Sequence, residues 1–259
     1  MAIDRALLDQ RCSLLRALHV PGTPLVLANA WDAASARAVV AAGFPVVATT
    51  SGGVAATLGY DDGQDAPVDE MYAAAARIAR SVDVPVTVDS EAGYRLEPGA
   101  LVERLLEVGA AGCNLEDTDH AGGGLLDVRE HAQWLSDVRR AAIARDYGLV
   151  INARIDVFIR QEQQETPALL DDAITRAREY IDAGADCVFP ILLHDVDVIT
   201  AFLDAVHFPV NIFAVPAAPS NATLAKMGVA RISYGSSIHR QSMRDLGARL
   251  EELARPIDQ

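Results

Sequence analysis

Three acidic residues stand where two short apolar runs of the chain end. Asp89 and Glu91 close the run PVTVDSE, and Glu116 closes the run AGCNLE. Carboxylates gathered at one edge repel one another unless a cation lies between them, and oxygen ligands suit Mg²⁺ or Mn²⁺. A single acid in such a place more often caps a helix or faces solvent. The three together predict a divalent metal site.

Other polar groups follow neighbouring apolar runs. Arg154 could pair with Asp117 or Asp156, or its guanidinium could hold a substrate carboxylate or an enolate oxygen through two parallel hydrogen bonds. The stretch TTSGG at 49–53 could offer backbone N–H groups to an anion, because glycine lets a ligand approach the backbone closely. Both features are consistent with an anionic substrate.

These groups together suit a substrate whose adjacent carboxylate and keto oxygens chelate a metal. The metal would act as a Lewis acid and stabilise the enolate that remains when a bond to the neighbouring carbon breaks. Enolate chemistry through a lysine imine is nearly excluded, because the sole lysine is Lys226, inside the helix-like stretch NATLAKMG.

Eight apolar runs rich in β-branched residues would have to position these side chains. Helical patterns rich in Ala, Leu, Glu and Arg separate the runs. Continuous apolar runs are typical of parallel strands that are covered on both faces. The predicted strands lie at 24–29, 45–51, 85–90, 111–117, 148–154, 186–191, 209–215 and 230–235.

The connections between helices and strands repeat one pattern. Several helical stretches stop at a glycine, expected to be left-handed, just before the next strand: Gly43, Gly109, Gly148, Gly184 and Gly228. This repeat in 259 residues predicts a single-domain (β/α)8 TIM-type barrel over 1–259, with terminal helices at 1–20 and 236–255. An open doubly wound sheet is the alternative, but no GxGxxG or phosphate-binding loop opens a helix.

The composition of the chain argues against several kinds of partner. The net charge is −14, from 36 acidic and 22 basic residues, which argues against nucleic acid or an anionic membrane as a partner. The first 20 residues carry charges throughout, unlike a signal peptide, and no apolar run reaches the roughly 18 residues of a membrane span. Cys12, Cys113 and Cys187 are too widely spaced to indicate zinc or a disulfide framework. We expect a cytoplasmic protein.

Four ordered motifs resemble the isocitrate lyase/phosphoenolpyruvate mutase superfamily. They are NAWDAASARAVVAAGFPVVATTSGGVAATLGYDDG, PVTVDSEAGY, GAAGCNLEDT and INARIDVF, and the similarity runs from about residue 24 to 190. The resemblance implies a (β/α)8 barrel, often with the last helix exchanged between the subunits of a homodimer or homotetramer.

The resemblance also implies roles for site residues. Mg²⁺, or Mn²⁺, would be held by the residue that matches Asp89, with Glu91, Glu116 and Asp62 helping directly or through water. We therefore expect the first three to be metal ligands and Asp62 to take part in catalysis.

The same resemblance implies a substrate-binding loop. Thr50, Ser51 and Gly52 would bind the carboxylate of a 2-oxo acid, together with Asp89, and Arg154 would lie at the substrate. The family's substrates are 2-oxo acids, or compounds that cleave to them, including pyruvate, oxaloacetate and phosphonopyruvate.

The segment after Glu116 departs from the family pattern. Lyases of the family carry a K-K/R-C-G-H loop whose Cys and Lys supply acid–base chemistry, whereas this chain has the shorter EDTDHAGGGLLD at 116–127. His120 could serve there as a general acid, or it could be a solvated loop residue. The glycine run 122–124 could form a lid or a plain turn.

These expectations define one leading function and three alternatives. The leading one is an Mg²⁺-dependent lyase for a small 2-oxo dicarboxylate, with decarboxylation of an oxaloacetate-like substrate favoured because it needs little acid–base machinery. C–C cleavage that yields pyruvate or a longer 2-oxo acid is second, and phosphonate P–C cleavage or phosphoryl mutation is third. A barrel that binds a 2-oxo acid without turnover is the alternative from another class.

Overall fold

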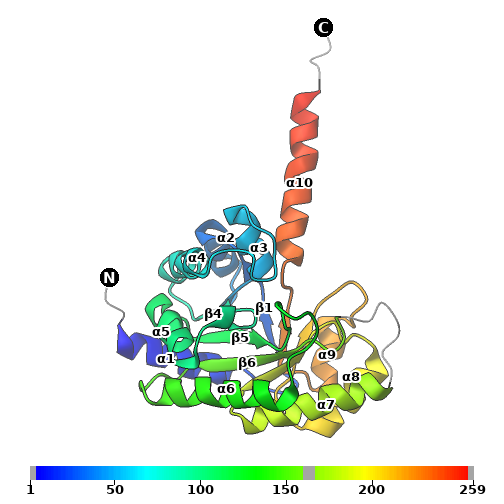
Figure 1. Cartoon of the computed structure of the whole chain (residues 1–259). Coiled ribbons are helices and arrows are strands. Elements are labelled where there is room, and N and C mark those ends of the chain that lie inside the picture. The colour runs from blue at the N-terminus through cyan, green and yellow to red at the C-terminus, as the bar shows by residue number, and fades with distance from the viewer. Residues whose placement is uncertain (1–3, 160–166, 256–259) are drawn as a thin grey trace.

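Short parallel strands form the inner layer of the structure (Figure 1), a computed structural model that describes residues 4–159 and 167–255. In these residues the strands are β1 (Leu25–Leu27), β2 (Asn29–Ala30), β3 (Val47–Thr49), β4 (Val86–Asp89), β5 (Gly112–Glu116), β6 (Val150–Ile155), β7 (Cys187–Pro190), β8 (Asn211–Phe213) and β9 (Arg231–Ser233).

The strands close into a ring. Strands β2 to β7 pair in sequence order, and β1, β9 and β8 form a second group of three. A parallel bridge from Val188 to Val210 connects β7 to the run that contains β8. Strands β1 and β2 are two halves of the first predicted run, separated by Ala28. The (β/α)8 TIM-type barrel predicted from the sequence is therefore confirmed.

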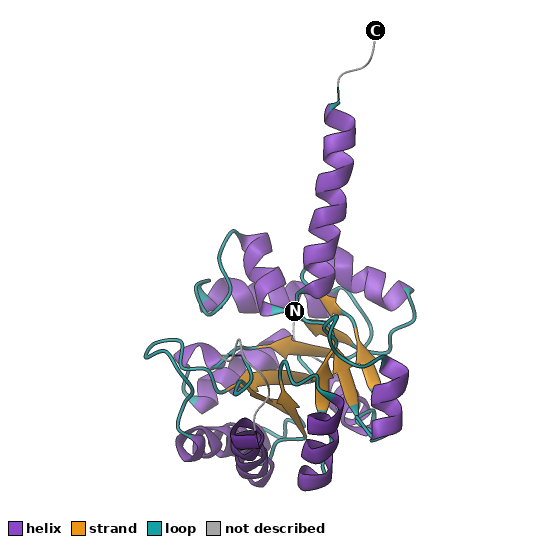
Figure 2. Cartoon of the chain, turned by 90° about the vertical axis from the view of Figure 1, so that its right-hand side faces the viewer, coloured by secondary structure: helices purple, strands orange, loops and turns teal. Residues whose placement is uncertain are grey.

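Helices surround this ring (Figure 2). They are α1 (Arg5–Ala17), α2 (Ala33–Ala41), α3 (Ser51–Leu58), α4 (Val68–Arg80), α5 (Pro98–Val108), α6 (Val128–Ile143), α7 (Pro167–Asp182), α8 (Val196–Val206), α9 (Asn221–Met227) and α10 (Ser237–Ala254), with a short 3₁₀ turn, η1 (Gly93–Arg95). Both views show α10 projecting away from the barrel (Figures 1 and 2). No helix in the described ranges is long and apolar enough to cross a membrane.

Two local predictions were wrong. The run 45–51 ends as a strand at Thr49, and Ser51 already begins α3. Gly148 has no left-handed backbone; the reversal after α6 falls on Asp146, with φ of 49°. A Cβ at Gly148 would lie 3.4 Å from the Cβ of Cys12 on α1, which is an ordinary van der Waals distance.

The buried His131 on α6 makes stability depend on pH. Burial, followed by the charge of Arg176, lowers the pKa of His131 to about 4, against about 6.5 in an unfolded chain. Between these values the unfolded chain binds a proton that the folded chain does not. We therefore expect stability to fall as the pH drops from about 6.5 to about 4, by about 3 kcal/mol from this group.

Urea unfolding at a series of pH values would measure this effect. His131→Phe should reduce the dependence over that interval by about half, because burial also lowers the pKa of His19 to about 4, whereas His207→Asn, at an exposed position, should leave it unchanged. An equally steep dependence in His131→Phe would show that other groups cause the acid sensitivity.

Candidate active site

The carboxyl ends of β4, β5 and β6 bring the predicted polar residues to one rim. Asp89, the last residue of β4, is in register with Asn114, and Glu116 at the end of β5 is in register with Arg154. Glu91 lies beyond its strand in a left-handed conformation, with φ of 46°, and its carbonyl accepts the N–H of Glu116. This turn places Glu91 next to Glu116.

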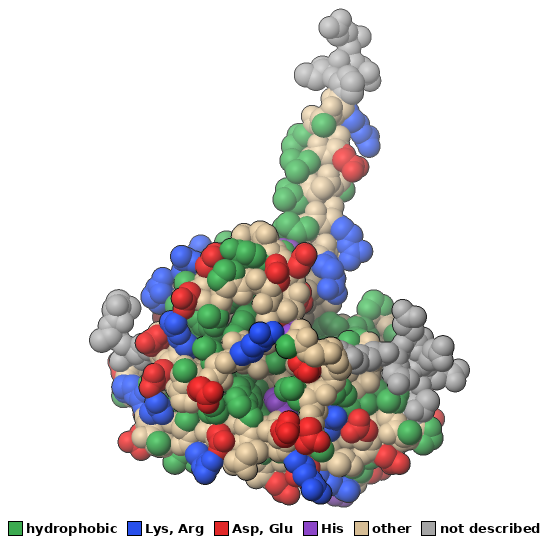
Figure 3. Space-filling model, viewed as in Figure 1, with side chains coloured by type: hydrophobic (Ala, Val, Ile, Leu, Met, Phe, Trp, Pro, Cys, Tyr) green, Lys and Arg blue, Asp and Glu red, His purple; other side chains and the backbone are tan. Residues whose placement is uncertain are grey.

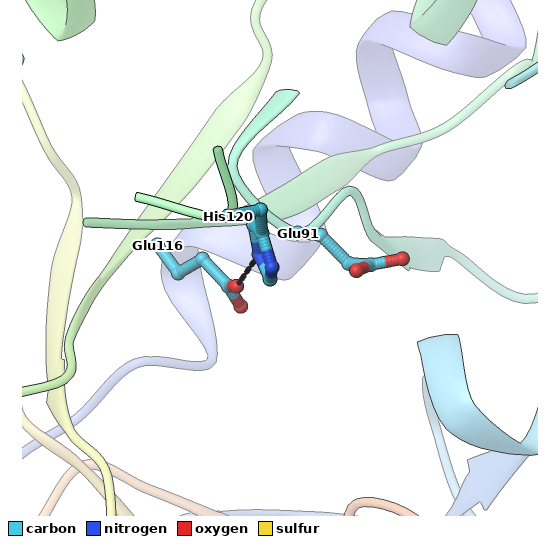
Figure 4. Close-up of side chains that lie close together, drawn as sticks. All are labelled: Glu91, Glu116 and His120. Carbon is cyan, nitrogen blue, oxygen red and sulfur yellow. Dashed lines mark hydrogen bonds and ion pairs between the residues drawn. The ribbon is translucent and has the colours of Figure 1, made fainter. Parts of the chain in front are cut away.

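Glu91, Glu116 and His120 form the candidate metal centre (Figure 4). One ligand atom from each of them lies within 4.8 Å of the other two. His120 Nε2 is 2.6 Å from Glu116 Oε1, and the Tyr94 hydroxyl donates to Glu91 Oε1 at 2.5 Å. Carboxylate oxygens are ligands that Mg²⁺ and Mn²⁺ prefer, whereas an imidazole nitrogen is more typical of Zn²⁺ and the later transition metals. The two carboxylates of the centre, Glu91 and Glu116, therefore fit the predicted cation.

Asp89 lies beside this centre but outside the close group. Its Oδ2 accepts the backbone N–H of Ser51 at 3.0 Å, and its own N–H donates to the hydroxyl of Thr49. Of the three predicted metal ligands, Glu91 and Glu116 therefore lie close to each other and to His120. Asp89 is turned toward the start of α3.

Burial makes the carboxylates of this rim hard to ionise. Burial raises the pKa of Asp89 and of Glu116, and the charge of Arg154 opposes the rise in both. Burial, together with the neighbouring carboxylates Asp89 and Glu116, raises the pKa of Glu91 to about 7 even though Tyr94 donates to it. A bound divalent cation would offset the cost of ionising these buried carboxylates, because it favours the ionised form of each ligand.

Arg154 is fixed by two acids. Its Nε and Nη2 donate to the two carboxylate oxygens of Asp156 at 2.6 and 2.8 Å, and its Nη1 is 2.6 Å from Glu116 Oε2. Burial opposes its charge, but Glu116 and Asp156 raise the pKa of Arg154, so the guanidinium stays charged. The hydroxyl of Thr118 also donates to Asp156. Of the two structural partners considered from the sequence, Asp156 is the one in contact.

Asp117, the other acid that the sequence offered as a partner for Arg154, belongs to a separate cluster. Its Oδ2 accepts from Arg176 at 2.9 Å and from the Tyr180 hydroxyl at 2.7 Å, and its Oδ1 accepts the N–H of Asp156. Asp117 therefore supports the residue that orients Arg154.

The predicted carboxylate-binding loop forms the first turn of α3. Thr50 Oγ1 is 2.7 Å from Ser236 Oγ, which comes from the end of the barrel. A Cβ added at Gly52 would lie 2.7 Å from Asp62 Oδ2. The loop and Asp62 are thus brought together, and a helix N-terminus offers N–H groups to an anion.

His120 lies in a tight turn rather than in a loose loop. The Asp119 carboxylate accepts the N–H groups of Ala121 and Gly122, and an antiparallel bridge joins Thr118 to Leu125. The His120 side chain is 19% exposed, and its hydrogen bond to Glu116 raises the pKa of the imidazole. Of the two sequence-based interpretations, a residue engaged in the site fits this contact better than a solvated one.

Sequence reasoning missed two residues that support the site. Tyr94 was part of the motif PVTVDSEAGY, and its place three residues after Glu91 was the available signal. Ser236 contacts Thr50, from which it is separated by 186 positions in the sequence, and no local sequence pattern predicts that contact.

Comparisons with known proteins agree with this barrel fold. The family model "Phosphoenolpyruvate phosphomutase" matches residues 15–254. The chain therefore belongs to the phosphoenolpyruvate mutase family, within the phosphoenolpyruvate mutase/isocitrate lyase superfamily. A solved structure of a "putative phosphonomutase" from Burkholderia cenocepacia is 41% identical, with a TM-score of 0.89, over 93% of this chain and 99% of that one.

Curated relatives include named lyases. An uncharacterized Mycobacterium tuberculosis protein is 36% identical over 85% of this chain and 80% of its own length. The "Probable 2-methylisocitrate lyase 2" of Corynebacterium glutamicum is 34% identical over 78% of this chain and 65% of its own length. The oxaloacetate decarboxylase of Pseudomonas savastanoi is 28% identical over 86% of this chain and 78% of its own length.

Proposed function

We propose that the protein is an Mg²⁺-dependent lyase that acts on a small 2-oxo (di)carboxylic acid through a stabilised enolate. The observation that carries this proposal is the cluster of buried Glu91 and Glu116 with the partly buried His120, beside the guanidinium of Arg154. Glu91, Glu116 and Asp89 would hold the cation, for which Mn²⁺ is a second candidate. When bound, Mg²⁺ would supply Lewis acidity toward the keto oxygen.

The remaining groups have distinct tasks. The loop from Thr50 to Gly52 would bind the substrate carboxylate through groups other than the Ser51 N–H, which Asp89 accepts, and Asp62, next to Gly52, would order this end of the site. Arg154, oriented by Asp156, would stabilise the negative charge that develops on the enolate oxygen.

Decarboxylation of an oxaloacetate-like substrate is the favoured reaction. The electron pair of the breaking C–C bond enters the enolate, CO₂ leaves, and a proton returns to the enolate carbon. His120 is the group in the site that could deliver this proton. The turn 116–127 carries no cysteine or lysine for a more demanding proton transfer, and the similarity to an oxaloacetate decarboxylase agrees with this choice.

A substrate panel tests the proposal. We would assay oxaloacetate, phosphonopyruvate, 2-methylisocitrate and 4-hydroxy-2-oxo acids, each with Mg²⁺ and with EDTA. We expect Mg²⁺-dependent release of CO₂ from oxaloacetate. Turnover of phosphonopyruvate alone would indicate P–C chemistry, and tight binding without turnover would indicate a binding protein. Turnover that persists fully in EDTA would refute the metal-dependent mechanism.

We also propose that the chain forms a homodimer or homotetramer through α10. No residue of this helix is buried, and Met243, Leu246, Leu250 and Leu253 are 45 to 67% exposed. Their spacing of three and four residues places them on one side, where Figure 3 shows hydrophobic side chains gathered. A contiguous exposed apolar surface of this kind commonly marks a site of protein association.

Charged residues on this stripe should dissociate the oligomer. The double variant Leu246→Asp/Leu250→Asp should sediment as a monomer in analytical ultracentrifugation, while Glu251→Ala, away from the stripe, should leave the assembly unchanged. If the wild type sediments as a monomer, or if the double variant keeps the wild-type mass, α10 does not hold subunits together.

A further inference from the structure

A cleft adjoins the candidate metal centre on the outer side of the barrel rim. It lies between η1, the turn at 118–126 and the start of α6, and its volume is about 270 Å³. Ala92, Ala121, Leu126 and Trp134 provide apolar walls. Figure 3 shows hydrophobic side chains and a histidine between charged groups on the face above α6.

We propose that this cleft binds an uncharged apolar substituent, a branched alkyl or aryl group, carried on the enolate carbon of the 2-oxo acid. The inference rests on the proposed function, because the head of the same molecule would occupy the metal centre.

His120 links the two spaces. Its Nε2 is 2.6 Å from Glu116 in the metal centre, and its side chain also lines the cleft. The segment after Asp62 also lies between the metal centre and the cleft. A Cβ at Gly63 would lie 3.5 Å from His120 Nδ1, and Gln64 lines the cleft. A group attached next to the chelated head would therefore meet the cleft directly.

His131 gives the cleft an unsatisfied polar wall. It is 3% exposed, and its Nε2 has no hydrogen-bond partner among residues 4–159 and 167–255. The ring stacks on Trp134 with centroids 5.6 Å apart and 20° between the planes. A buried nitrogen without a partner is costly, and an ordered water beside the apolar group would satisfy it.

The charges of the cleft disfavour a second carboxylate there. Asp119 and Glu130 contribute two negative charges to its lining, and Arg95 contributes one positive charge. The inner wall is neutral, because burial lowers the pKa of His131 to about 4. A neutral substituent thus avoids a net repulsion that a distal carboxylate would meet.

The size of the cleft also fits such a group. A cavity of roughly 150 Å³ with apolar walls holds benzene, and this cleft exceeds that volume. Trp134 and His131 present flat rings against which a phenyl or branched alkyl group can pack.

Calorimetric titration of the Mg²⁺-loaded protein tests the inference with 3-substituted pyruvates. We would compare pyruvate, oxalate, 4-methyl-2-oxopentanoate, phenylpyruvate and 2-oxoglutarate. The two apolar acids should bind at least about tenfold more tightly than pyruvate, whereas 2-oxoglutarate should show no such gain. Apolar acids that bind no better than pyruvate would overturn the inference while leaving the proposed function standing.

Variants of the lining residues test whether the cleft causes this gain in affinity. Ala121→Trp should fill the cleft and reduce the affinity ratio of phenylpyruvate to pyruvate to about one. Leu126→Trp fills it from the other wall and serves if the first variant is unstable. Ala201→Trp, at an exposed position on α8, should keep the wild-type ratio. A ratio that survives both cleft variants would overturn the inference, and failure of pyruvate and oxalate to bind at all would refute the proposed function and the inference with it.

Discussion

Replacing Arg154 by methionine should lower kcat/KM for the substrate by about 10²- to 10³-fold, the usual cost of losing a donor that stabilises a developing oxyanion. Its side chain is only 14% exposed, and its guanidinium is held by Asp156 and contacts Glu116 at the metal centre. We expect most of the loss in kcat, because the charge on the enolate oxygen develops in the transition state.

The methionine variant also leaves two carboxylates without their cation, so its stability must be measured alongside its activity. Breaking a buried ion pair by removing one partner costs about 3–5 kcal/mol. Arg154→Lys keeps a charge but loses the two-pronged contact to Asp156, and we expect an intermediate loss of activity. Arg129→Met, at an exposed position on α6, is the matched control. Wild-type kcat in a folded Arg154→Met protein would contradict the role given to this residue.

Asp89→Asn should abolish the Mg²⁺-dependent activity and weaken Mg²⁺ binding by at least about 100-fold, because a metal ligand contributes more than the outer contacts whose loss costs 10- to 100-fold. Its backbone contacts to Ser51 and Thr49 are compatible with asparagine, so the fold should persist. Glu116→Gln should behave similarly but with a loss of stability, since Arg154 and His120 both contact this carboxylate.

His120→Gln separates two assignments of the centre. If Asp89, Glu91 and Glu116 hold the cation, this variant should keep its Mg²⁺ affinity within about threefold and lose kcat, as expected for a proton donor. If His120 is instead a ligand, as its distance from Glu116 permits, the variant should lose Mg²⁺ affinity and Asp89→Asn should retain it. Calorimetric titration of both variants with MgCl₂ distinguishes the two arrangements.

The sequence was sufficient for the barrel because its signals are local and repeated. Glycines such as Gly109 and Gly184 do take the left-handed backbone expected between helix and strand. Gly148 did not, because the reversal after α6 falls two residues earlier, on Asp146. The glycine pattern therefore places the reversal between helix and strand only approximately.

The candidate site was likewise predicted only in part, because some of its contacts come from elements that are distant in sequence. The positions of Asp89, Glu91 and Glu116 at strand ends followed from apolar runs and parallel pairing. The orientation of the Asp89 carboxylate toward Ser51 depends on α3, which begins at Ser51 and which the sequence pattern, with a strand over 45–51, did not predict. The cleft at His131 and Trp134 was not foreseen either, because both residues are part of an ordinary amphipathic helix pattern and only the packing of η1 and the turn 118–126 over α6 creates it.

Exchange of the methyl protons of pyruvate in D₂O, followed by proton NMR, tests the central claim most directly. An enolate forms and collapses in this reaction whichever bond the natural substrate breaks. We predict that the protein with Mg²⁺ accelerates loss of the methyl signal, and that EDTA or Arg154→Met suppresses it. Exchange at the rate of buffer alone, or an acceleration that EDTA leaves intact, would contradict a metal-stabilised enolate at this site.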